Sequence, residues 1–150
     1  MLLHPIDARH QQALDSGIQF ENPVGHPILD EFGFEALLFP GQTAGSIILH
    51  TTKHGGVLLT GDSAMGTTSN QSKAGSERLV RPPIETSVDD PGLRVQWLAF
   101  DRLVATVLPC HGTGYIDRQA NDIASIMRHL VRPEPTHWNE LEDYSLTVVI

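Results

Sequence analysis

The pattern that most constrains the fold of this chain is a strand, a tight loop and a β-hairpin within residues 34–60. The apolar run FEALLF at 34–39 predicts a strand, and the loop 40–46 that follows it contains two glycines. The β-branched run at 47–52 and the run at 57–60 flank Gly55-Gly56, a pair of residues that strongly favours a hairpin turn. This part of the chain is therefore predicted to be a small β-sheet.

The remaining patterns add helices and further strands. Apolar residues at 103–108 predict a buried strand that stops at Pro109, and the spacing of apolar residues at 119–130 predicts an amphipathic helix. Asp90 is predicted to cap a helix that begins at Pro91. The other expectations are a polar helix at 7–14, turns at 21–33, a long surface excursion at 63–90 and a last strand at 145–150. Mixed strands and helices predict an α/β or α+β protein.

Length and charge exclude several classes of function. With 150 residues, we expect one domain over 1–150, and no apolar run approaches the length of a membrane span. The formal net charge of −8 and the absence of a Lys/Arg cluster argue against partners such as nucleic acid or a membrane surface. Cys110 is the single cysteine, which predicts a reducing, cytoplasmic location.

Four turns at predicted strand ends carry the residues of chemical interest. They are the loop Pro40–Ser46, the turn His54-Gly55-Gly56, the segment Thr60-Gly61-Asp62-Ser63, and Leu108-Pro109-Cys110-His111-Gly112. Binding and catalytic residues are concentrated in such connections.

In order and spacing, these motifs resemble the second half of a metallo-β-lactamase-fold hydrolase, over about residues 34–118. That family has Pro-Gly-His-Thr-x-Gly-Ser before a hairpin, then Thr-Gly-Asp, then Leu-Pro-x-His-Gly. His4-Pro5-x-Asp7 resembles more loosely the segment after the family's first metal motif. The resemblance implies a metallo-β-lactamase-like αβ/βα sandwich, of which this chain is approximately the second half. It also implies hydrolysis of an ester, thioester, amide or phosphoester by metal-bound hydroxide.

The resemblance also assigns two metal ligands. Asp62 stands where the family has a carboxylate that bridges two metals, and His111 where it has the last imidazole of the second metal. The implied cofactor is a divalent metal, zinc first, with iron and manganese as alternatives.

Two departures limit what this chain can do. Gln42 occupies the place of a metal-binding histidine, so that position is vestigial, and a glutamine oxygen suits calcium or magnesium better than zinc. The family's first motif, His-x-His-x-Asp-His, is absent. Asp62 and His111 alone fall short of the three or four ligands of a zinc site.

Several interpretations therefore stay open. The chain is expected to be the truncated C-terminal part of a hydrolase, inactive alone, whose partners are a small-molecule substrate and a missing N-terminal half. The alternative is a non-catalytic binding or scaffold protein with a degenerate site and no metal. A third is a homodimer that builds one site from two chains and covers an otherwise open sheet.

The other polar residues receive structural interpretations. His4 and Asp7 are predicted to lie at a helix entry, and His50 and His54 to be exposed. Cys110 is predicted to be a small buried apolar residue and no nucleophile. Arg78 and Arg81 are expected in a solvated loop, with contact to an anionic substrate as the alternative. Surface or capping roles are expected for His10, His26, His129 and His137.

Overall fold

The computed structural model describes residues 1–66 and 77–141 and shows a mixed α+β protein. Four strands form the main sheet, in the order β1-β2-β3-β6, and the short strands β4 and β5 form a separate pair. The strands are β1 (Glu35–Leu38), β2 (Ile47–Thr51), β3 (Val57–Gly61), β4 (Met65–Gly66), β5 (Leu79–Val80) and β6 (Thr106–Pro109).

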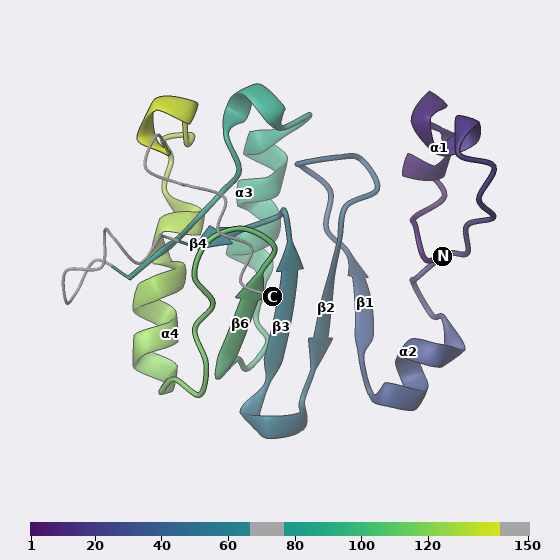
Figure 1. Cartoon of the computed structure of the whole chain (residues 1–150). Helices are drawn as coiled ribbons and strands as arrows, with labels where there is room; N and C mark the ends of the chain where they lie inside the picture. Colours follow the sequence, from purple (N-terminus) through teal and green to yellow (C-terminus); the bar gives the residue numbers. More distant parts are fainter. Residues whose placement is uncertain (67–76, 142–150) are drawn as a thin grey trace.

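The helices lie at the two ends of this strand order. Figure 1 shows α3 and α4 on the β6 side, and α1 and α2 on the β1 side. The α-helices are α1 (Gln11–Asp15), α2 (Pro27–Phe32), α3 (Asp90–Ala99) and α4 (Ala120–Met127). Short 3₁₀ helices are η1 (Asp7–Arg9), η2 (Lys53–Gly55), η4 (Ile84–Thr86), η5 (Arg128–Val131) and η6 (Trp138–Glu140).

The predicted hairpin is confirmed. Strands β2 and β3 are antiparallel and are joined by η2, whereas β3 and β6 are parallel and are connected through α3. Gly56 ends the turn with φ of +100°, and a Cβ atom there would overlap the carbonyl oxygen of Leu103. Glycine at this position therefore allows the hairpin to lie directly against the segment that leads into β6.

Helices α3 and α4 cover one face of the sheet. Ile48, Leu58 and Val107 lie on this face and are fully buried, in one cluster with Trp97 of α3 and Ile123 of α4. On the opposite face, Leu49, Leu59 and Leu108 are aligned across three strands, and Leu108 is 37% exposed. Both faces of the central strands are apolar, but α3 and α4 pack on only one of them.

Several helix boundaries differ from the sequence predictions. Helix α3 begins at Asp90, and its N-cap is Asp89, whose carboxylate accepts from the backbone N–H of Gly92. The helix predicted at 119–130 is α4 followed by η5. The helix predicted at 7–14 is divided at His10 into η1 and α1, and the turn-rich segment 21–33 contains α2.

The predicted exposure of three residues was wrong. His50 is 3% exposed, and its Nε2 is 3.0 Å from the carbonyl oxygen of Leu103. Arg81 is fully buried and lies beside β5, so residues 63–90 are not wholly a surface excursion. Cys110 is exposed, because it lies in the turn after β6 and not in the core. The strand predicted at 145–150 lies outside the described residues.

None of the helices in residues 1–66 and 77–141 has the length and hydrophobicity that a membrane-spanning segment requires.

Candidate functional site

Asp62 and His111 lie together where two parallel strands end. Asp62 directly follows β3, and His111 comes two residues after β6. Neighbouring parallel strands end at the same edge of a sheet, so the turns that follow β3 and β6 meet there. The backbone N–H of Cys110 donates to the carbonyl of Gly61 at 3.2 Å and joins the two turns. His111 Nε2 is 3.2 Å from Asp62 Oδ1, and the two side chains are 40% and 46% exposed.

The turn that carries His111 is held in place by a backbone hydrogen bond to β4. The N–H of Gly66, in β4, donates to the carbonyl of His111 at 2.9 Å. Gly112 has φ of +79°, and a Cβ atom there would overlap the carbonyl oxygen of Gly66. A glycine after His111 is therefore required for this close approach, which sets the position of the imidazole.

Gln42 lies in the loop between β1 and β2, next to the same site. Together with Asp62 and Ser63 it lines a cavity of about 200 Å³. The loop is closed by its own side chains: Ser46 Oγ accepts from the N–H of Thr43 at 2.9 Å and lies 3.5 Å from Gln42 Oε1. The structure thus places Gln42 and Asp62 in the lining of one cavity.

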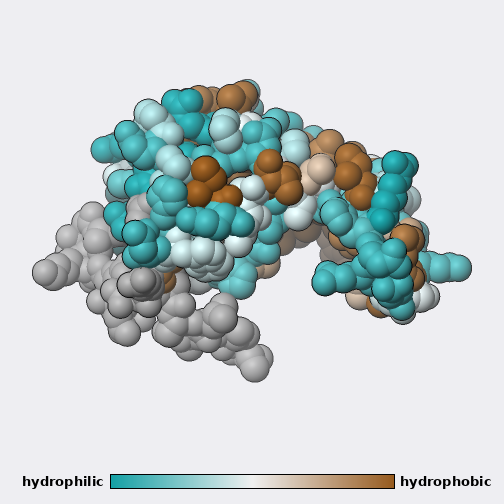
Figure 2. All heavy atoms as spheres, turned by 90° about the horizontal axis from the view of Figure 1, so that it is seen from above, coloured by the Kyte–Doolittle hydropathy of each residue, from teal (hydrophilic) through white to brown (hydrophobic). Residues whose placement is uncertain are grey.

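Asp7 makes a contact that sequence reasoning missed. Its carboxylate accepts from Thr43 Oγ1 at 2.5 Å and from the N–H of Gly45 at 2.9 Å, and a Cβ atom at Gly45 would overlap it. Asp7 does begin η1, but its side chain docks the N-terminal residues on the Gln42 loop. His4 also lines the cavity. Seen from above, the surface is hollowed between the main body and this N-terminal part (Figure 2).

Ser63 adds a buried polar atom to the cavity wall. It is 1% exposed, and its Oγ has no hydrogen-bond partner among the described residues. Its backbone carbonyl accepts from Trp97 Nε1 at 3.1 Å, which ties the turn after β3 to α3. Buried hydroxyl groups are normally hydrogen-bonded, so this one marks an unsatisfied position at the edge of the site.

The residues present do not fit a complete zinc site. Over the described ranges, no group of three or more His, Cys, Asp or Glu side chains is placed to hold a metal ion. Asp62 and His111 supply two donors and Gln42 a neutral amide oxygen, whereas a catalytic zinc ion takes three protein ligands of the nitrogen, sulfur or carboxylate kind. In this arrangement the carboxylate and the imidazole are paired with each other.

Cys110 does not have the properties of an activated nucleophile. Although the residue as a whole is exposed, partial desolvation of the thiol and, after it, the negative charge of Asp62 raise the pKa of Cys110 above the ordinary value. A reactive cysteine needs the opposite shift, which cationic neighbours or a helix N-terminus provide.

Comparison of the chain with protein-family models, with curated proteins and with solved structures finds no match. The motifs and the geometry of the site are therefore the basis for a function.

Proposed function

We propose that this chain is the C-terminal part of a hydrolase of the metallo-β-lactamase superfamily, and that it contributes Asp62 and His111 to the metal site. The substrate class is an ester, thioester, amide or phosphoester. One observation carries the proposal: the two residues, 49 positions apart in sequence, meet at 3.2 Å at the ends of the parallel strands β3 and β6.

The order of the elements supports the same proposal. The loop with Gln42 precedes a hairpin, Asp62 follows the second strand of that hairpin, and His111 follows a strand reached through a helix. This is the arrangement that the ordered motifs imply for the family. The α+β composition and the mixed sheet are consistent with it.

We also propose that this part of the chain is not sufficient for catalysis by itself. Two ionisable ligands cannot hold a catalytic zinc ion in the usual coordination, so further ligands have to come from another segment or another chain. No hydrolytic step is assigned to the described residues alone.

A second candidate function is a binding or scaffold protein with a degenerate site. Gln42 favours it, because the amide replaces an imidazole at a position beside Asp62. The direct pairing of Asp62 with His111 favours it too, because the two groups satisfy each other without an ion.

Zinc titration of the purified chain separates the two candidates. Under the first, isothermal titration gives weak binding that both Asp62→Asn and His111→Ala abolish. The matched control is His54→Ala, which removes an exposed histidine of the hairpin turn. Zinc that binds only the folded state also raises the melting temperature, and a chelator reverses the rise. Zinc binding that survives both site variants, or none at all, would favour the second candidate.

Activity provides the other half of the test. With zinc present, the chain alone is expected to show no robust turnover of nitrophenyl esters or phosphoesters. Robust zinc-dependent turnover that Asp62→Ala leaves undiminished would refute the assigned roles. Reading the encoding DNA upstream of the Met1 codon tests the source of the missing ligands: an open frame with His-x-His-x-Asp-His would supply them.

A further inference from the structure

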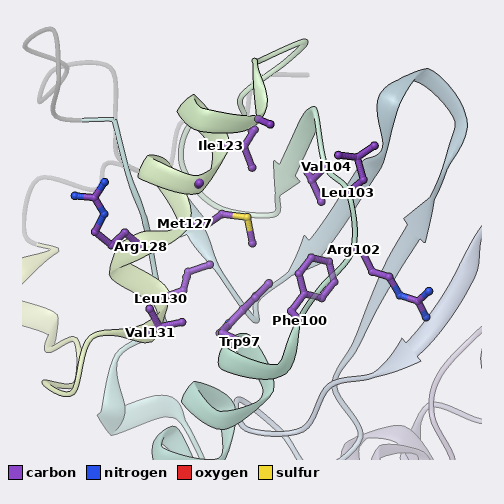
Figure 3. Close-up of a pocket in the computed structure, with 12 residues that line it drawn as sticks. Trp97, Phe100, Arg102, Leu103, Val104, Ile123, Met127, Arg128, Leu130 and Val131 are labelled. Carbon is purple, nitrogen blue, oxygen red and sulfur yellow. The ribbon is translucent and has the colours of Figure 1, made fainter.

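A second cavity, of about 420 Å³, lies away from Asp62 and His111, between α4 and the segment that joins α3 to β6. Figure 3 shows Trp97, Phe100 and Met127 directed toward it. Leu103 and Val104, which line it, precede β6, whereas His111 follows that strand. The two sites are therefore at opposite ends of β6.

The charges at this cavity are of one sign. Arg102 and Arg128 are its charged lining residues among those described, in a chain whose net charge is −8. Figure 3 shows their guanidinium groups on opposite sides, extended away from the centre, so the interior itself is apolar. A cavity with an apolar interior and cationic edges is complementary to an amphipathic anion.

The two arginines differ in whether they form an ion pair. Arg102 forms an ion pair with Glu35, with Nη2 3.2 Å from Oε2. Arg128 is exposed and forms no ion pair with a described residue. Arg94 does not line the cavity, and its Nε donates to the carbonyl of Val131 at 2.8 Å. Arg128 is accordingly the group available to an incoming anion.

We propose that this cavity binds a monomeric medium-chain carboxylate. Its alkyl chain would lie against Trp97, Phe100 and Met127, and its carboxylate would reach Arg128. The volume is within the range of small-molecule sites, and a guanidinium pairs well with a carboxylate. The net charge of −8 disfavours an anionic membrane surface as the source of the same chemistry.

Decanoate below its micellar concentration is the probe. Trp97 is 4% exposed and lines the cavity, whereas Trp138 is 53% exposed, so a Trp138→Phe background makes Trp97 the fluorescent reporter. We expect a saturable change in its emission and a matching isotherm by calorimetry. Decyltrimethylammonium, with the same chain and the opposite charge, is expected to bind more weakly.

Three variants locate the ligand. Ala124→Trp fills the cavity from an exposed position of α4 and is expected to abolish binding, which is measured by calorimetry because the variant adds a second tryptophan. Arg128→Gln is expected to weaken it roughly two- to fivefold, as is usual for an exposed charge pair. Arg9→Gln, the matched control, removes an exposed arginine of η1 that does not line the cavity, and it is expected to leave binding within about twofold. Circular dichroism of each variant shows that the fold is retained.

Other results would overturn the proposal. Equal affinity for decanoate and decyltrimethylammonium would show a nonspecific apolar surface. Binding to phosphatidylserine vesicles with no response to monomeric decanoate would show a lipid surface as the source. Self-association by light scattering that Ala124→Trp abolishes, with no decanoate binding, would show that a second copy covers the cavity.

Discussion

Arg81 and Asp90 form a fully desolvated ion pair that joins β5 to the first turn of α3. Arg81 Nε donates to Asp90 Oδ1 at 2.7 Å and Nη2 to Oδ2 at 3.2 Å, and the two side chains are 0% and 5% exposed. Nη1 donates to the carbonyls of Leu130 and Arg132, and Nη2 to that of Glu134. All five N–H groups are used, so this arginine holds β5, α3 and the residues around η5 together.

Replacing Arg81 by methionine is expected to lower the free energy of unfolding by about 3–5 kcal/mol, because Asp90 is left charged, buried and unpaired. Urea denaturation measures the change. The double variant Arg81→Met/Asp90→Leu is expected to lose less than the sum of the two single variants, since it leaves no buried charge. Strict additivity would show that the two residues act independently.

Replacing Gln42 by histidine is expected to strengthen zinc binding by more than roughly tenfold, because it adds an imidazole beside Asp62. Calorimetric titration of both proteins measures the difference. Gln42→Asn is the control, since it keeps an amide and adds no strong ligand. An unchanged affinity for zinc in Gln42→His would mean that the loop does not face the ligands in solution.

Replacing Asp7 by alanine is expected to release the N-terminal residues from the Gln42 loop, because two hydrogen bonds to its carboxylate are lost. Hydrogen exchange is the measurement: the Gly45 amide, which donates to Asp7, should exchange at least roughly tenfold faster. Asp15→Ala is the control, since Asp15 is an exposed residue at the end of α1 whose carboxylate accepts from Gln11 Nε2 and does not contact the Gln42 loop in the hydrogen bonds of the described residues. Equal protection of Gly45 in both variants would contradict the docking role.

The pKa of His129 is expected to lie below its ordinary value of about 6.5, because burial and then the charges of Arg78, Arg132 and Arg128 disfavour its protonated form. NMR titration measures it. Arg78→Gln is expected to raise this pKa, and by more than Arg128→Gln does. The unfolded chain therefore binds the proton at a higher pH than the folded chain does. The free energy of unfolding accordingly decreases as the pH falls from about 6.5 toward the lower pKa that His129 has in the folded chain. A folded pKa above 6.5 would reverse that sign.

Local sequence patterns were sufficient for three strands of the main sheet, whereas the fourth strand, predicted at 103–108, is β6 at Thr106–Pro109. The apolar runs and Gly55-Gly56 predicted β1, β2, β3 and their hairpin because alternation and turn preference are set by neighbouring residues. The ends of helices were less predictable. Asp89, not Asp90, caps α3, because either carboxylate fits the local pattern and the carboxylate of Asp90 forms an ion pair with Arg81.

The sequence by itself determined an acidic α+β chain whose motifs place Asp62, Gln42 and His111 in turns at strand ends. Tertiary structure alone decided which polar residues are buried and which hydrogen-bond partners they have. Asp7 reaches Thr43 across 36 positions, His50 reaches Leu103 across 53, and Arg81 reaches Leu130 across 49. The physical reason is that burying a polar group is favourable only when a partner satisfies it, and here each partner comes from a distant part of the chain.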